Sequence, residues 1–167
     1  MSERTQFTLG IVAHNRFGVL SQVAGLFAKR GYNIDSLSLG ETDDRAWSRM
    51  TVVCTGDEYM REQVVRQLEK LHDVRRVWCF TKERSVTSEH LLIKVAVTPE
   101  KPDSKAVLSS LIIAHSGKVL DFGDNFLTAE ITAPSAQIDA VINTARGYGI
   151  LEMCRSGMLA VWRGVSG

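Results

Sequence analysis

The fold is decided by residues 7–31, which read FTLGIVAHNRFGVLSQVAGLFAKRG. In the first half of this stretch apolar side chains alternate with other side chains at Phe7, Leu9, Ile11 and Ala13, which is typical of a strand with one buried face. The period then changes, and a helical stripe follows at positions i, i+3, i+4 and i+7: Leu20, Val23, Ala24 and Phe27. Gly31 suits the left-handed position that ends many helices. The stretch predicts a strand, a short loop and a helix.

The rest of the first half completes a βαββαβ unit. Strands are expected over residues 33–40, 47–55 and 74–81. A helix is expected between the last two strands, because Asp57 is a good N-cap for a helix with a buried stripe at Met60, Val64, Leu68 and Leu71. This order of elements predicts a ferredoxin-like sandwich, in which two helices cover one face of an antiparallel sheet.

The second half repeats the unit. Strands are expected over residues 91–97, 119–122, 126–131 and 150–154, with helices around 107–112 and from Ser135 onward. The predicted fold class is therefore α+β, with two tandem ferredoxin-like domains. We expect the first domain over residues 1–82, a polar linker over 83–89 and the second domain over 90–167.

Composition excludes several classes of protein. Apolar residues make up 44% and charged residues 23% of the 167 residues, the balance of an ordinary folded protein. The net charge of +1 gives no basic surface for nucleic acid, and no apolar run is long enough to span a membrane. Three cysteines, Cys54, Cys79 and Cys154, lack metal-ligand or disulfide spacing, so we expect them to be buried and reduced in a cytoplasmic protein.

No catalytic constellation is present in the sequence. The four histidines fall in four different predicted elements, and neither a G-x-S-x-G elbow nor a phosphate-binding Walker loop occurs. Asp43-Asp44 is typical of a solvated turn, and Arg75-Arg76, close to Glu69 and Asp73, indicates a mixed-charge surface. We therefore expect no catalytic residues and no metal site.

The strongest candidate for a binding site is the loop Asn15-Arg16-Phe17-Gly18. The free N–H groups at the start of the following helix attract a carboxylate, and glycine lets a ligand approach the backbone closely. Asn33, with an amide that can donate and accept, suits the polar head of an amino acid. An Asn cap and an ordinary turn would explain the same residues without a ligand. The corresponding loop of the second domain, residues 98–103, has two prolines and no glycine, so only one site is expected per chain.

Several co-linear motifs resemble the regulatory (small) subunit of acetolactate synthase, also called acetohydroxyacid synthase. They are residues 15–20 (NRFGVL), 30–37 (RGYNIDSL), 48–52 (SRMTV), 56–58 (GDE) and 155–164 (RSGMLAVWRG). The resemblance implies that the first domain is an ACT domain, which binds amino acids at a dimer interface. It also implies a non-catalytic subunit that activates a separate catalytic subunit and confers feedback inhibition by valine, or by another branched-chain amino acid.

Carried over by position, the resemblance implies that Gly18 and Val19 present loop amides to the effector carboxylate and that Asn15 fixes the loop. It implies that Asn33 from a facing subunit binds the effector's polar head, and the full expected effector site is Asn15, Gly18, Val19, Leu20, Asn33 and Ile34. Thiamine diphosphate, magnesium and FAD are expected in the catalytic subunit and no cofactor in this chain. The single two-domain copy without a transit sequence indicates a bacterial-type cytoplasmic subunit.

Apolar strand residues on the second face of the first sheet, such as Val12, Val53, Trp78 and Phe80, suggest contact with another subunit and hence a homodimer. Three other functions share parts of the pattern. A stand-alone ACT-type sensor of another enzyme or of transcription would use the same loop. An RNA-binding ferredoxin-like domain would need a basic surface with exposed aromatic residues, and a small phosphatase would use Arg16 as a phosphate ligand.

Overall fold

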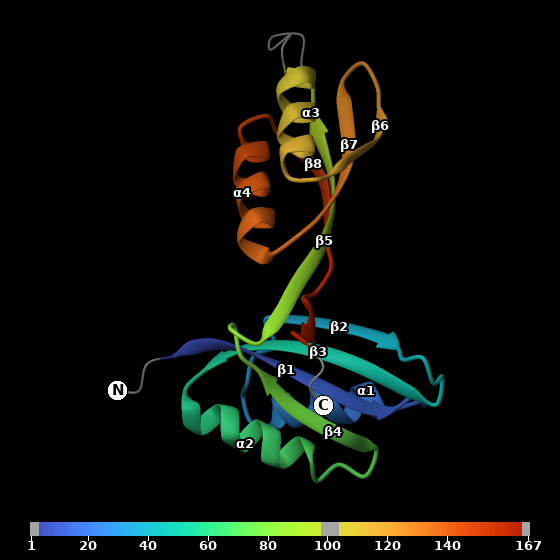
Figure 1. The fold of residues 1–167 in the computed structure, drawn as a ribbon, viewed down its shortest axis with the longest axis vertical. Helices are drawn as coiled ribbons and strands as arrows, with labels where there is room; N and C mark the ends of the chain where they lie inside the picture. The colour runs from blue at the N-terminus through green and yellow to red at the C-terminus, as the bar shows by residue number, and fades with distance from the viewer. Residues whose placement is uncertain (1–3, 98–103, 165–167) are drawn as a thin grey trace. The chain divides into compact units, whose positions relative to one another are not determined.

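A computed structural model describes residues 4–97 and 104–164, and it divides the chain into two compact units. The first unit comprises Met1–Val86 together with Gly157–Gly167, and the second comprises Thr87–Ser156. Each unit contains an antiparallel sheet with two helices (Figure 1). The predicted fold class, two ferredoxin-like βαββαβ units, is confirmed.

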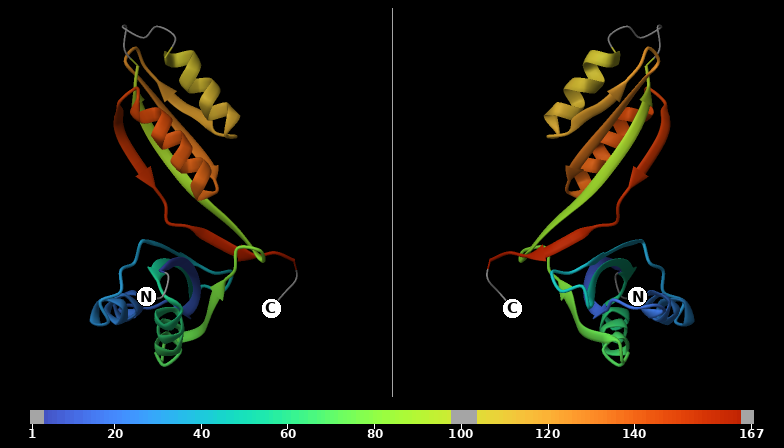
Figure 2. Two further views of the ribbon diagram at one scale, coloured as in Figure 1. Left: turned by 90° about the vertical axis from the view of Figure 1, so that its left-hand side faces the viewer. Right: turned by 90° about the vertical axis from the view of Figure 1, so that its right-hand side faces the viewer.

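The first unit is built around its first strand. The sheet has the order β2-β3-β1-β4, with β1 (Thr5–His14), β2 (Ser36–Glu41), β3 (Trp47–Gly56) and β4 (Val74–Phe80). Helices α1 (Val19–Lys29) and α2 (Glu58–Leu68) lie on the same face of this sheet (Figure 2). The alternating side chains predicted for the first strand, Phe7, Leu9, Ile11 and Ala13, form one buried cluster with the apolar stripes of both helices.

Local signals set the helix ends as expected. The Asp57 carboxylate accepts a hydrogen bond from the backbone N–H of Met60 at 2.8 Å, which caps α2. After α1, Gly31 has a φ of 66°, and the N–H groups of Gly31 and Tyr32 reach back to the carbonyls of Ala28 and Phe27. This is the Schellman arrangement, which needs a left-handed residue at the position of Gly31. Strand β2 begins at Ser36, three residues later than predicted, and Asn33 and Ile34 belong to the connecting loop.

The second unit repeats the topology with the order β6-β7-β5-β8. Its elements are β5 (Ser85–Ala96), α3 (Ser104–Ala114), β6 (Lys118–Phe122), β7 (Phe126–Ala133), α4 (Ser135–Arg146) and β8 (Ile150–Arg155). The core again lies between helices and sheet, with Leu91, Ile93 and Val95 of β5 packed against Leu108 and Ile112 of α3.

The chain end departs from the sequence prediction. Residues 83–89 were expected to be a linker, yet β5 begins at Ser85, and residues 157–164 were expected in the second domain, yet they belong to the first unit. A further strand, β9 (Leu159–Trp162), pairs with β5. The backbone N–H of Arg163 donates to the carbonyl of Arg84 at 2.7 Å, and its Nε donates to the carbonyl of Ser85. The polar stretch becomes a strand because the distant chain end supplies its hydrogen-bond partner.

This C-terminal segment, residues 157–163, lies on the face of the first sheet that carries no helix. Arg49 of β3 donates from Nη2 to the carbonyl of Ala160 at 2.6 Å, and the Met158 N–H donates to the Ser36 hydroxyl at 3.0 Å. Trp162 packs on Phe80 of β4 with 4.7 Å between ring centroids. Part of the apolar second face that suggested contact with another subunit is therefore covered by the chain itself.

Two glycines permit this close layering. A side chain at Gly10 would collide with the ring of Trp78, which lies across the middle of β1. A Cβ at Gly157 would lie 2.5 Å from the backbone carbon and oxygen of Leu37, so only glycine lets the segment descend onto β2.

The cysteine prediction is only partly right. Cys54 is buried, Cys79 is partly buried and Cys154 is exposed, and all three are free thiols. Burial raises the pKa of the Cys54 thiol to about 12, so this side chain is a protonated, unreactive part of the core at neutral pH. Cys154 is opposite Leu92 of β5, a residue whose side chain is also exposed, and not opposite the buried Leu91 or Ile93.

We predict that Gly157→Ala destabilises the first unit by about 1–3 kcal/mol, because the added methyl group meets backbone atoms that cannot move aside. All three tryptophans, Trp47, Trp78 and Trp162, lie in this unit, so urea unfolding followed by tryptophan fluorescence reports on it. Gly40→Ala on β2 is the matched control, since nothing lies within 4 Å of its Cβ position, and it should change stability by less than about 0.5 kcal/mol. Equal unfolding midpoints for both variants would contradict the packing described for the segment.

Candidate functional site

The loop 15–18 joins the end of the central strand β1 to the start of α1. Gly18 precedes the first helical residue in the left-handed region, with φ 87° and ψ −14°, which strains any residue with a side chain. No atom lies within 4 Å of the position that a Cβ would occupy. The glycine therefore serves the loop conformation and leaves open space in front of the helix.

The first turn of α1 has unsatisfied donors. No side chain caps the helix, and no acidic residue lies in its first turn. Among the described residues, no acceptor is found for the backbone N–H groups of Leu20 and Ser21, while the N–H of Val19 makes only a long 3.4 Å bond to Arg16. Free N–H groups at the positive end of a helix dipole form a site that favours an anion.

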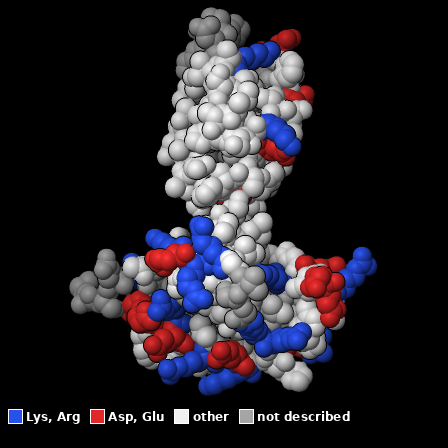
Figure 3. Space-filling view, in the orientation of Figure 1, with Lys and Arg blue, Asp and Glu red and all other residues white. Residues whose placement is uncertain are grey.

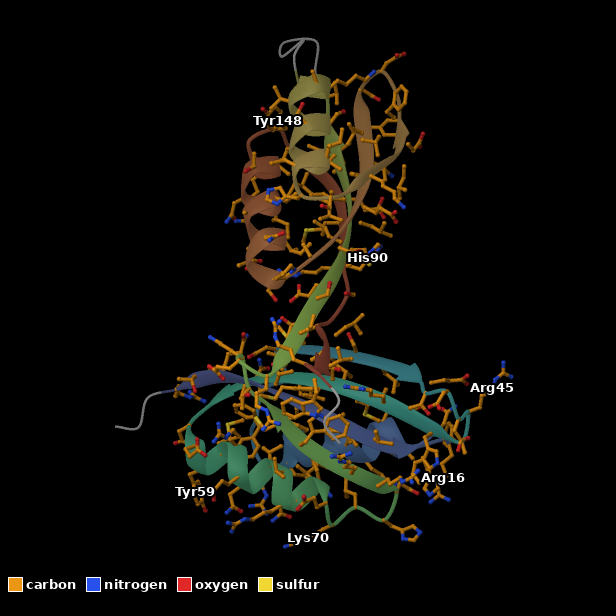
Figure 4. The ribbon with its side chains drawn as sticks, in the orientation of Figure 1. Arg16, Arg45, Tyr59, Lys70, His90 and Tyr148 are labelled. Atoms are coloured by element: carbon orange, nitrogen blue, oxygen red, sulfur yellow. The ribbon has the colours of Figure 1, made fainter. Side chains whose placement is uncertain are left out.

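Asn15 does not cap the helix. Its side chain points to the turn between β2 and β3, where Nδ2 donates to Glu41 Oε1 at 3.1 Å and to the carbonyl of Arg45 at 3.0 Å. Its backbone N–H donates to the carbonyl of Ala46 at 2.8 Å. Arg16 and Arg45 accordingly lie at the same end of the first unit (Figure 4). Asn15 thus ties the loop to the neighbouring hairpin.

Asp73 is a second anchor, which sequence reasoning missed. Its carboxylate is almost wholly buried, and it forms an ion pair with the exposed guanidinium of Arg16 in the loop. The same carboxylate accepts a hydrogen bond from Gln22 of α1 at 3.3 Å, and the carbonyl of Asp73 accepts one from the His14 N–H. A buried carboxylate needs such partners, because leaving it unpaired costs several kcal/mol. No spacing rule links residues 16 and 73, so only the fold shows this contact.

The other expected site residues of the helix have different environments. The Val19 side chain is buried in the core, so only its backbone faces the loop. The Leu20 side chain is 39% exposed at the start of the helix, where it can contact an apolar group of a ligand.

Asn33 and Ile34 lie at the opposite end of α1 from Gly18. The helix has 11 residues, which corresponds to a length of about 16 Å. Asn33 is exposed and donates to the Asp35 carboxylate at 2.7 Å, while Ile34 packs partly against the core. The fold of one chain therefore brings together four of the expected site residues, Asn15, Gly18, Val19 and Leu20. The other two, Asn33 and Ile34, lie at the far end of α1.

Residues 98–103, the second-unit loop expected to lack a site, lie outside the described residues. Over the described ranges 4–97 and 104–164, no group of three or more His, Cys, Asp or Glu side chains could hold a metal ion. In the same ranges, every helix is too short or too polar to cross a membrane.

Comparisons with known proteins agree with the motifs noted in the sequence. Residues 9–76 match the family described as AHAS small subunit-like ACT domain, and residues 88–164 match the family described as small subunit of acetolactate synthase. The Aquifex aeolicus acetolactate synthase small subunit is 40% identical over 156 residues, which cover 93% of this chain and 80% of that protein. The Escherichia coli acetolactate synthase isozyme 3 small subunit is 35% identical over 157 residues, covering 93% and 94%.

The fold is shared with a solved member. The crystal structure of the acetolactate synthase small subunit from Thermotoga maritima has a TM-score of 0.88 and 30% sequence identity, and the match covers 97% of this chain and 99% of that one. Both halves of the sequence and the complete architecture thus correspond to a single family. The chain belongs to the acetolactate synthase small subunits.

Proposed function

We propose that this chain is the non-catalytic regulatory subunit of an acetolactate synthase, which activates the catalytic subunit and makes it sensitive to feedback inhibition by valine or a related branched-chain amino acid. The observation that carries the proposal is the start of α1, where left-handed Gly18 opens the space in front of the N–H groups of Leu20 and Ser21, which have no acceptor among the residues that the structure describes. Such a site accepts a carboxylate without any cation of its own.

The proposed ligand also has an ammonium group and an apolar side chain. The exposed Asn33 amide oxygen is a suitable acceptor for the ammonium group, and the exposed face of Leu20 is a suitable contact for a branched aliphatic side chain. These features lie about 16 Å apart along α1 in one chain. We therefore propose a homodimer in which α1 of one subunit runs antiparallel to α1 of the other, so that each site combines Gly18 of one chain with Asn33 of its partner.

The two anchors of the loop give a route from the effector to the rest of the first unit. Asn15 connects the loop to the β2–β3 turn, and Arg16 connects it to Asp73 beside the start of β4. A ligand that fixes the conformation of the loop would favour the positions of the β2–β3 turn and of the start of β4 that fit this conformation. Coupling to a distant active site requires such a ligand-dependent shift between two arrangements.

The proposed partner is the catalytic subunit, in keeping with the family of small subunits to which the chain belongs. We propose that thiamine diphosphate, magnesium and FAD are bound by that subunit, that this chain carries no cofactor or catalytic residue, and that the complex works in the cytoplasm. A stand-alone sensor would bind the same effector but would not change acetolactate formation by a catalytic subunit.

We predict that Gly18→Asp abolishes valine feedback while leaving activation of the catalytic subunit largely intact. The introduced carboxylate occupies the place of the effector carboxylate and repels it, and a loss of about 3 kcal/mol of binding lowers the affinity roughly a hundredfold. The assay is acetolactate formation by the reconstituted holoenzyme over a valine titration. Gly164→Asp is the matched control, because Gly164 is also left-handed with no atom near its Cβ position. Wild-type feedback in the Gly18 variant would refute the site.

We predict that mixed dimers identify a shared site. A heterodimer of one Gly18→Asp chain and one Asn33→Ala chain would contain one doubly substituted site and one site with neither substitution. Calorimetry should detect about one valine per heterodimer, two per wild-type dimer and none at the same concentrations for either parental homodimer. If a site were built within a single chain, the heterodimer would bind no valine, and a monomer in sedimentation would also contradict the proposal.

A further inference from the structure

The helix-free face of the first sheet carries a series of arginines stacked on aromatic rings. Arg75 lies over Trp47 with 4.8 Å between the guanidinium carbon and the ring centroid, and Arg76 lies over Trp78 at 5.3 Å. Further along the face, Arg49 lies between Trp78 and Phe80, and Arg84 lies over Trp162. Stacking holds each guanidinium in a fixed orientation, which reduces the entropy lost when it binds a carboxylate.

A β-bulge places Arg75 and Arg76 on the same face. In the pairing of β1 with β4, Val12 is opposite Arg76 and Ala13 is opposite Val74, so Arg75 is an extra residue in β4. Consecutive residues of a regular strand point to opposite faces, whereas both of these arginines contact tryptophans of one face. The bulge thereby doubles the positive charge at this point of the sheet.

None of these arginines meets a carboxylate in the part of the chain that the structure describes. Within the described part of the chain, no carboxylate oxygen lies within 4.0 Å of the guanidinium of Arg49, Arg75, Arg76, Arg84 or Arg163. Ion pairs do form elsewhere, as on α2, where Arg66 meets Glu62, and across the second sheet, where Lys94 meets Glu152. Charged side chains of both signs are abundant on the first unit in Figure 3, but among the described residues the stacked arginines of this face contact aromatic rings and not carboxylates.

Part of this series already serves the C-terminal segment. Arg49 donates to the carbonyl of Ala160 in that segment, and burial lowers the pKa of the Arg49 guanidinium. Arg163, which belongs to the segment, donates to the carbonyl of Ser85. Arg75 and Arg76 remain exposed and form one wall of a cleft of about 460 Å³, with Val12 and Trp47 among its lining residues. Thr42, Asp43 and Asp44 line the same cleft from the β2–β3 turn.

We infer that this cleft is a docking surface for the catalytic subunit, whose carboxylate side chains pair with Arg75 and Arg76; the inference rests on the function proposed above. Each guanidinium can donate two parallel, charge-assisted hydrogen bonds to one carboxylate, so Arg75 and Arg76 together can bind two acidic side chains. A nucleic acid fits less well, because both tryptophans already stack with side chains of this chain and are not free to stack on bases. The surface also adjoins the elements that hold the effector loop, since Asp73 directly precedes β4.

The test is the affinity of the full-length chain for its catalytic subunit, measured by surface plasmon resonance at about 0.1 M salt. The double variant Arg75→Glu, Arg76→Glu should weaken binding about tenfold or more, mainly through a slower association rate that depends on salt. The control, Arg66→Glu with Lys70→Glu, makes the same change of charge on the helix-bearing side, where Figure 4 labels Lys70, and should change the affinity less than about threefold. Valine binding by both isolated variants should match the wild type.

The outcomes separate this inference from the proposed function. If the wild-type chain fails to bind the catalytic subunit, the proposed function is wrong. If it binds and the Arg75/Arg76 variant binds equally well, the docking surface is wrong. Should the reversal unfold the first unit, Arg75→Gln with Arg76→Gln gives the same test without added repulsion. Tight binding of a single-stranded RNA oligomer that only the Arg75/Arg76 variants lose, with unchanged affinity for the catalytic subunit, would assign the surface to nucleic acid and overturn the inference.

Discussion

Burial of β1 on both of its faces is the constraint on which the first unit depends. Leu9, Ile11 and Ala13 have no exposed surface on the helix side, while Gly10 on the other side lies beneath the ring of Trp78. Pairing with β3 and β4 fixes the register of β1, and contacts on both faces fix its orientation in the unit. The strand ends at His14, directly before the loop 15–18. The loop therefore follows directly from the central strand of the unit, and the C-terminal segment covers part of the second face.

The sequence predicted what local chemistry determines. The change of period after Ala13, the left-handed Gly31 and the Asp57 cap are readable because each acts on neighbouring residues. The C-terminal segment and the Arg16–Asp73 pair could not be predicted, since they join residues that only the fold brings together. The same limit applies to the surroundings of Arg75-Arg76. A mixed-charge surface was predicted from the sequence neighbours Glu69 and Asp73, but Asp73 turns inward to Arg16, and the acidic residues that share the cleft with both arginines are Asp43 and Asp44 of the β2–β3 turn.

The candidate site combines a rigid base with unsatisfied groups. When a carboxylate replaces water at the free N–H groups of a helix start, each neutral hydrogen bond to water is exchanged for a stronger, charge-assisted hydrogen bond to the carboxylate. The loop is tied to the β2–β3 turn by Asn15 and to Asp73 by Arg16. An effector that orders the loop would therefore act on both edges of the cleft, through Asn15 and Arg45 toward Asp44, and through Arg16, Asp73 and Val74 toward Arg75. Effector binding and partner docking would then be linked within one small unit.

The central claim is that the effector's carboxylate is bound by the first-turn amides of α1. Hydrogen–deuterium exchange of the full chain, with and without saturating valine, tests it most directly, because an amide that donates to a bound carboxylate exchanges more slowly. The account predicts that the amides of Leu20 and Ser21, which have no acceptor among the described residues, slow about tenfold or more, with a second protected segment around Asn33. Valine binding that leaves residues 18–22 unchanged and protects another segment would contradict it.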